Sequence, residues 1–222
     1  MIILIGGEKG GSGKTTLVTN IAALTVQEGQ DLLLVDTDKQ GSASSWCAVR
    51  DENKSAKRVA SIQKFGETLG DEIRALKEKY VHVLIDAGGQ NSIELRSAMT
   101  VADKVFVPIQ AGQFDIWTLG VMDSLVKNMK IINPNLKAYV VINRGPTNHT
   151  SSEVQEVLDV LNDFENLDLV QSVIHERIAF RKAAKEGLGV TELSKLDSKA
   201  CLEMKELYEE IYNVKSISKT AC

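Results

Sequence analysis

The sequence has few of the residues that mark secreted, disulfide-stabilised or membrane-spanning proteins. Only three of its 222 residues are cysteines, and their spacing fits neither a disulfide framework nor a metal site. The apolar run at residues 1–5 is far too short for a signal peptide or a membrane span, and no later run is long enough. Aromatic residues make up 5% of the chain, so the core must be aliphatic. We therefore expect a cytoplasmic protein that makes no membrane contact.

Positive charge is also scarce. The chain has 30 acidic residues against 26 lysines and arginines, which gives a formal net charge of −4. The overall charge therefore gives no reason to expect nucleic-acid binding. Any surface for a polyanion must be a local basic patch on an acidic protein.

Short apolar runs alternate with helical stretches along most of the chain. Several of these runs are continuously apolar, which is typical of a parallel sheet covered on both faces. The expected strands are Ile2–Ile5, Leu32–Asp36, Val81–Asp86, Lys104–Ile109, Lys137–Asn143 and Leu169–Ile174, with an edge strand around Arg58–Ile62 inside the charged segment 51–66. The expected helices are Thr15–Glu28, Glu67–Lys79, Ile93–Val101, Trp117–Ile131, Ser151–Asn162, Arg177–Glu186 and Ser198–Tyr212.

This order of elements predicts an α/β fold with a doubly wound, mostly parallel sheet flanked by helices. No linker, repeat or low-complexity tract interrupts it. We expect one domain over residues 1–212, followed by a C-terminal tail at 213–222.

A glycine-rich loop lies between the first expected strand and the first expected helix. Its glycines permit positive φ angles, which let backbone N–H groups turn toward a polyphosphate beside the positive end of the helix. Lys14 would reach the β- and γ-phosphates, and the Thr15 hydroxyl would ligate Mg²⁺. The predicted ATP/ADP-binding residues of this loop are Lys9, Gly10, Gly11, Ser12, Gly13, Lys14, Thr15 and Thr16. The alternative, a glycine turn with a chance lysine, is disfavoured by the strand–loop–helix context.

Three aspartates follow expected strands. Asp36 and Asp38 are two residues apart on an extended segment, so both point toward the phosphate end of the sheet. Asp86 ends an apolar strand in the Walker B pattern, and its carboxylate is expected to hold Mg²⁺ through water. The alternative for Asp36 and Asp38 is a pair of turn or helix-capping residues. The next segment, residues 87–90, is a candidate switch that senses the γ-phosphate.

With Lys9 in front, the loop Lys-Gly-Gly-Ser-Gly-Lys-Thr-Thr resembles the deviant Walker A motif of the ParA/MinD superfamily of P-loop ATPases. In that family the front lysine crosses a dimer interface to the phosphates bound by the other subunit. The resemblance therefore implies an ATP-dependent homodimer in which Lys9, Lys14 and Asp38 are catalytic. Asp38 would orient the attacking water, and Asp36, with Thr15 and Asp86, would serve the Mg²⁺ site. Asn143 would contact adenine, unless it merely begins a turn.

The chain departs from the family pattern at three places. Glu8 stands where the loop motif usually begins with glycine, and we expect its carboxylate to point away from the phosphates. Lys39 occupies the position of proline in the family's Asp-x-Asp-Pro-Gln-Gly. Ala87-Gly88-Gly89-Gln90 replaces the Thr-Pro-Pro common in the family.

Within the superfamily, the chain most resembles small ParA-type partition ATPases of plasmids and chromosomes. The loop begins at residue 9, which leaves no room for an N-terminal helix-turn-helix domain. The resemblance implies that an ATP-bound dimer binds nonspecific DNA on the nucleoid, and that a ParB-type centromere-binding protein stimulates hydrolysis. The candidate DNA contacts are Arg177, Arg181, Lys182 and Lys185, which fall within about two helical turns. The alternative for these residues is a solvated charged helix.

Two other functions remain open. One is a positioning ATPase of the same fold that places a protein cargo. The other is a metabolic ATP-dependent ligase of related fold, which would have no need of a lysine that crosses to a second subunit. The membrane-binding MinD branch is disfavoured because four glutamates lie on the last expected helix and would be repelled by anionic lipid.

Overall fold

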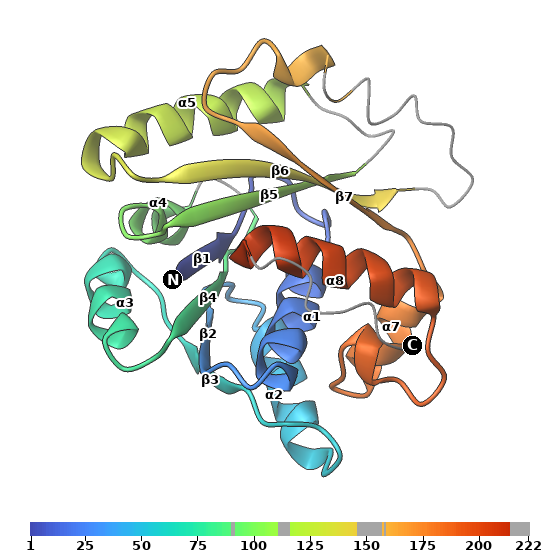
Figure 1. The fold of residues 1–222 in the computed structure, drawn as a ribbon. Helices are drawn as coiled ribbons and strands as arrows, with labels where there is room; N and C mark the ends of the chain where they lie inside the picture. The colour runs from blue at the N-terminus through green and yellow to red at the C-terminus, as the bar shows by residue number, and fades with distance from the viewer. Residues whose placement is uncertain (90–91, 111–115, 146–156, 158, 214–222) are drawn as a thin grey trace.

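The computed structural model of the chain describes residues 1–89, 92–110, 116–145, 157 and 159–213. Its framework is a seven-stranded sheet in the order β3-β2-β4-β1-β5-β6-β7, and all neighbouring strands are parallel (Figure 1). The strands are β1 (Ile2–Ile5), β2 (Leu32–Asp36), β3 (Ala60–Gln63), β4 (His82–Asp86), β5 (Lys104–Gln110), β6 (Lys137–Gly145) and β7 (Asp168–His175).

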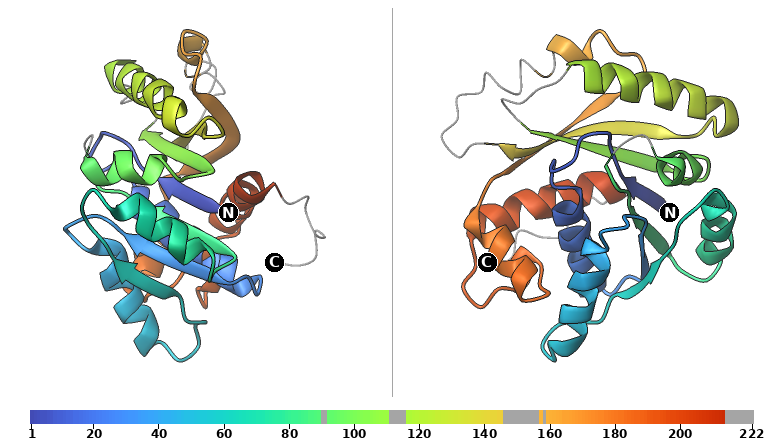
Figure 2. Two further views of the ribbon diagram at one scale, coloured as in Figure 1. Left: turned by 90° about the vertical axis from the view of Figure 1, so that its left-hand side faces the viewer. Right: turned by 180° about the vertical axis from the view of Figure 1, so that it is seen from behind.

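Helices cover both faces of this sheet (Figure 2). One buried apolar cluster packs helices α1 (Lys14–Gln27), α2 (Ser42–Glu52), α7 (Ile178–Lys185) and α8 (Ser198–Tyr212) against the sheet, and the short 3₁₀ helix η1 (Val190–Glu192) joins it. A second cluster packs α3 (Leu69–Lys77), α4 (Ile93–Met99) and α5 (Ile116–Ile132). The predicted doubly wound α/β fold is confirmed. In the part of the chain that the structure describes, no helix has the length and apolar character needed to cross a membrane.

The predicted elements differ from the structure in a few places. The expected edge strand is confirmed as β3, which pairs with β2. Helix α2 was not predicted from the sequence. The helix expected at Ser151–Asn162 lies mostly outside the described residues, although 159–161 are helical. Residues 214–222 of the expected tail also lie outside them.

The sheet brings the predicted site residues to one edge. At the carboxyl ends of β2 and β4, Asp36 is paired in register with Asp86, and Asp86 is also paired with Ile5 of β1. The loop after β1 therefore emerges between the ends of β4 and β5. This is the point where the strand order changes direction, at which open α/β sheets bind their ligands.

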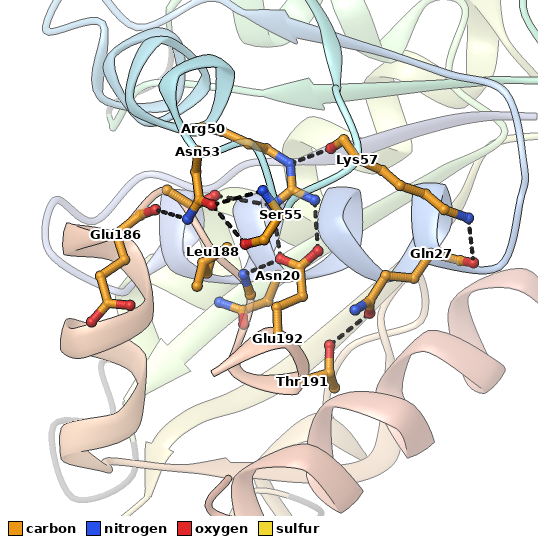
Figure 3. Close-up of polar contacts among 12 residues, drawn as sticks. Asn20, Gln27, Arg50, Asn53, Ser55, Lys57, Glu186, Leu188, Thr191 and Glu192 are labelled. Carbon is orange, nitrogen blue, oxygen red and sulfur yellow. Dashed lines mark hydrogen bonds and ion pairs between the residues drawn. The ribbon is translucent and has the colours of Figure 1, made fainter. Parts of the chain in front are cut away.

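A buried ion pair joins α2 to the segment after α7 (Figure 3). The Arg50 guanidinium donates two hydrogen bonds of 2.7 Å to the Glu192 carboxylate. It also donates to the backbone carbonyls of Gly187, at 2.9 Å, and Lys57, at 2.7 Å. The two side chains are 0% and 8% exposed, so this cation and its partner are removed from water together. Helix α2 is thereby fixed to residues 187–192.

Replacing Glu192 by alanine should lower the free energy of unfolding by about 3 kcal/mol, because Arg50 would remain buried without its counter-charge. Urea unfolding followed by circular dichroism measures this loss. The exposed neighbour Glu186 provides the control, and Glu186→Ala should change stability little. Equal midpoints for the two variants would contradict the prediction.

Candidate nucleotide site

A cavity of about 570 Å³ opens at the carboxyl edge of the sheet. The loops after β1, β2 and β4 and the end of β6 contribute to its wall. The lining residues are Gly10, Gly11, Gly13, Lys14, Thr15, Thr16, Thr37, Asp38, Lys39, Gln40, Ser42, Gly88, Gly89, Ser92, Glu94 and Arg144. Most of the predicted phosphate-binding residues are thus brought together with Asp38. Glu8 does not line this cavity as the described residues form it.

Two amide side chains hold the glycine-rich loop from behind. Asn143, at the end of β6, donates from Nδ2 to the Ser12 carbonyl at 2.7 Å, and Gln110, at the end of β5, donates from Nε2 to the Gly11 carbonyl at 2.9 Å. In a trans peptide the N–H points opposite to the carbonyl. The N–H groups of Ser12 and Gly13 therefore point away from these amides, as an anion site requires. Gln110 was not singled out by the sequence analysis.

Gly13 could not be replaced by a larger residue. Its φ angle is 86°, in the region that L-residues rarely adopt. A Cβ atom on Gly13 would lie 2.3 Å from the Asn143 Nδ2 atom. The close contact between Asn143 and the loop therefore depends on glycine at this position.

Lys14 is held inside the site, with 7% of its surface exposed. Its Nζ atom donates to the Lys9 carbonyl at 2.8 Å. Burial lowers the pKa of Lys14, and the nearby Asp86 and Asp38 carboxylates oppose this shift. A cation in such a poorly solvated position attracts a phosphate more strongly than it would in water.

Thr15 and Asp86 form a pair of oxygen ligands suited to a hard divalent cation. The Thr15 hydroxyl donates to Asp86 Oδ2 at 2.8 Å, and Asp86 Oδ1 is buried with no hydrogen-bond partner among the described residues. Burial raises the pKa of Asp86 to about 7, although the Thr15 hydroxyl lowers it. A buried carboxylate oxygen without a partner beside a hydroxyl fits Mg²⁺, which prefers oxygen ligands.

The Asp36 carboxylate is fully buried and both its oxygens are engaged. Oδ1 accepts from the Asp38 backbone N–H at 3.1 Å. Oδ2 accepts from the backbone N–H and the hydroxyl of Ser44, each at 2.8 Å. Asp36 thus fixes the loop that carries Asp38 and caps the first turn of α2, as the alternative interpretation of this residue expected.

The segment after β4 lies against both the glycine-rich loop and Asp38. A Cβ atom on Gly88 would lie 3.4 Å from Asp38 Cγ, and one on Gly89 would lie 3.3 Å from the backbone of Gly10. The predicted switch segment is therefore in contact with Asp38 and with the glycine-rich loop. Its last residue, Gln90, lies outside the described residues.

Arg144 is a further residue of the cavity wall that the sequence analysis did not single out. Its φ angle is 56°, which is uncommon for a residue other than glycine and often accompanies a functional constraint. Its Nε atom lies 3.4 Å from the position that a Cβ atom on Gly13 would take. The only sequence signal was its place directly after Asn143.

The basic residues of α7 do not line the cavity. Arg181, Lys182 and Lys185 are exposed on this helix. Arg177 differs from them: it ion-pairs with Glu203 of α8 at 2.6 Å, and 14% of its side chain is exposed. Its guanidinium thus links α7 to α8.

Asp86→Asn should stabilise the nucleotide-free protein at pH 8 and have little effect at pH 4. The folded-state pKa of Asp86, about 7, lies above the ordinary value of 3.8, so folding favours the protonated acid. The contribution of this group to stability is therefore full below about pH 4 and is lost as the pH rises through 7. Thermal unfolding should show a Tm gain of several degrees at pH 8.

The exposed Asp163 provides the control, since Asp163→Asn should shift the Tm equally at both pH values. An Asp86→Asn shift that does not depend on pH would contradict the assignment. The same variant should lose the part of nucleotide affinity that depends on Mg²⁺.

Comparison with known proteins identifies this architecture. The family model of the CobQ/CobB/MinD/ParA nucleotide binding domain matches residues 3–190. The chain is 25% identical over 214 residues to the maintenance of carboxysome distribution protein A of Halothiobacillus neapolitanus, covering 94% of this chain and 95% of that protein. It is 28% identical over 162 residues to the chromosome-partitioning ATPase Soj of Thermus thermophilus, covering 61% and 65%.

Solved structures show the same fold. The ATP complex of a variant McdA from Cyanothece superposes with a TM-score of 0.76 at 13% identity, covering 98% of each chain. The septum site-determining protein MinD of Pyrococcus horikoshii, complexed with Mg-ADP, superposes with a TM-score of 0.70 at 20% identity, covering 99% of each. The chain therefore belongs to the CobQ/CobB/MinD/ParA nucleotide-binding domain family and is an ATPase of the ParA/MinD type.

Proposed function

We propose that this ATPase binds Mg-ATP in the cavity, forms an ATP-dependent homodimer, binds nonspecific DNA and releases it after hydrolysis. A ParB-type centromere-binding protein would stimulate hydrolysis, and the cycle would segregate DNA in the cytoplasm, on the nucleoid. The observation that carries the nucleotide part is the buried Asp86 oxygen that has no hydrogen-bond partner in the part of the chain that the structure describes, next to Thr15 and the buried Lys14. These groups have unsatisfied charge and hydrogen-bonding capacity that Mg²⁺ and a triphosphate would satisfy together.

The residues around the cavity suit phosphoryl transfer to water. Bound Mg²⁺ would neutralise charge on the β- and γ-phosphates. Lys14 would leave the Lys9 carbonyl and donate to the phosphate oxygens. Asp38 lies in the wall opposite Gly88, and its carboxylate would accept a hydrogen bond from the attacking water. Such positioning supplies most of the catalysis in this reaction class.

The nucleoside is proposed to lie on the β6 side of the loop. Asn143 would contact adenine there, with its Nδ2 atom already engaged by the Ser12 carbonyl. Its Oδ1 atom would accept from the adenine amino group, and its second Nδ2 hydrogen would remain for a ring nitrogen of the base. Lys9 is proposed to reach the phosphates bound by the other subunit.

The proposed DNA surface is the exposed side of α7. Three cations, Arg181, Lys182 and Lys185, share this side at helical spacing. Arg177 was also predicted as a DNA contact, but its ion pair with Glu203 assigns its charge to holding α7 on α8. Such a patch binds phosphates without reading bases, which is the behaviour required for nonspecific DNA.

A second candidate is a positioning ATPase whose cargo is a protein assembly. The similarity to the carboxysome distribution protein favours it, because that match spans nearly the whole of both chains. Both candidates share the nucleotide cycle and the DNA surface and differ only in the cargo. Affinity purification of the ATP-bound protein separates them: a DNA-bound adaptor supports segregation, and a cargo component supports positioning.

DNA binding should require ATP and the α7 cations. An Arg181→Glu/Lys182→Glu variant is expected to lose at least tenfold in affinity for random-sequence duplex DNA with Mg-ATP, with a smaller salt dependence because fewer counterions are released. Fluorescence anisotropy with ATP, ADP or no nucleotide measures both effects.

The control for this experiment is Lys127→Glu, which changes an exposed lysine of α5 on the other face of the sheet. It should bind DNA like the parent protein. Equal DNA affinity for parent and α7 variant, or DNA affinity that ATP does not strengthen, would refute the proposed DNA surface.

Lys9→Ala should separate nucleotide binding from dimerisation. The Lys9 carbonyl that holds Lys14 belongs to the backbone and is kept in this variant. We therefore expect Mg-ADP affinity within about threefold of the parent protein and no dimer with a non-hydrolysable ATP analogue, as measured by sedimentation velocity. A variant that still forms the dimer would exclude a crossing role for Lys9.

A further inference from the structure

Lys39 is a charged residue of the cavity wall that none of the roles above includes. It directly follows Asp38, whose Oδ1 atom accepts from the Gln40 backbone N–H at 2.9 Å. This hydrogen bond closes a tight turn around residue 39, so Lys39 lies at its tip. The residue is exposed and lines the same cavity as the glycine-rich loop.

An acidic residue of the same cavity wall lies within electrostatic reach of Lys39. Glu94, in the first turn of α4, also lines the cavity, and its Oε1 atom accepts from the Gly66 backbone N–H at 3.2 Å. The pKa of Glu94 is lowered, chiefly by a hydrogen bond from its own backbone and also by the Gly66 N–H, the Ser92 hydroxyl and the Lys39 charge. Lys39 and Glu94 therefore carry opposite charges on the wall of one cavity.

The sheet order defines which end of a bound nucleotide Lys39 would meet. Loops after β2 and β4 lie on one side of the glycine-rich loop, and the end of β6 lies on the other. Thr15 and Asp86, which fit the cation shared by the β- and γ-phosphates, belong to the same side as Lys39. Arg144 belongs to the opposite side. Lys39 is thus at the terminal-phosphate end.

We propose that Lys39 is a third phosphate-binding lysine, which turns from Glu94 to the γ-phosphate and makes the subunit prefer a nucleoside triphosphate to a diphosphate. The inference rests on the proposed binding of Mg-ATP in this cavity. Lys14 would reach the β-phosphate, which ATP and ADP share, as well as the γ-phosphate, whereas a group at the turn of residues 38–40 would meet only the γ-phosphate. A charge-assisted hydrogen bond of this kind, partly exposed to solvent, is worth about a tenfold difference in affinity.

The test compares two nucleotides on one variant. Lys39→Gln should bind a non-hydrolysable Mg-ATP analogue about tenfold more weakly than the parent protein and should bind Mg-ADP equally well. Lys39→Arg should retain most of the preference. Lys195→Gln removes another exposed lysine, one that is not among the residues lining the cavity, and should change neither affinity. The Tm of each variant checks that it is folded.

The variant Glu94→Gln provides an independent test of the proposal. The amide oxygen still accepts from the Gly66 N–H, while the negative charge that attracts Lys39 and repels the γ-phosphate is removed. We expect this variant to bind the Mg-ATP analogue several-fold more tightly than the parent protein. An unchanged affinity would contradict the exchange between Glu94 and the phosphate.

Several outcomes would overturn the role of Lys39. Equal weakening of both nucleotides, or weakening of neither, would show that the lysine does not contact the third phosphate. A loss seen only at protein concentrations where dimers form would place its contact on the second subunit instead. A parent protein that binds neither nucleotide would refute the proposed function itself, which is a different result from any of these.

Discussion

The site depends on the orientation of two peptide groups. Asn143 and Gln110 bind the carbonyls of Ser12 and Gly11 from the sheet side, so the opposite N–H groups are directed to the cavity before any ligand arrives. Both amides come from the carboxyl-terminal parts of two strands, β6 and β5. The loop is thereby preorganised by the sheet, and binding does not have to order it.

The same edge of the sheet concentrates buried charge. Lys14 and Asp86 are both nearly inaccessible to water, and the pKa of each is displaced toward its neutral form by burial. Without a ligand, these two groups lower the free energy of unfolding, because removing an ionisable group from water opposes folding. Their presence at a strand–loop–helix junction makes sense when a polyphosphate and its cation complete the set of charges.

Much of the fold and of the nucleotide site could be predicted from the sequence because the motifs that indicate them are local. The glycine-rich loop, Asp38 and Asp86 follow apolar runs whose strand character is evident from a few neighbouring residues. Helix α2 was not predicted because its N-cap residue, Gly41, has no side chain to cap it, and the carboxylate that caps its first turn belongs to Asp36, eight residues before Ser44. Gln110 and Arg144 were not predicted because their roles arise only when β5 and β6 align beside β1. The hydrophobic periodicity of a sequence carries no information about such contacts across the sheet.

Helix α2 is fastened at both of its ends. Asp36 holds the first turn, and Glu192 and Gly187 hold Arg50 near the last. The helix cannot slide along its axis unless one of these buried contacts breaks. Any movement of the Asp38 turn during the nucleotide cycle is therefore either absorbed within residues 37–41 or transmitted as a rigid displacement to residues 187–192, which directly follow α7.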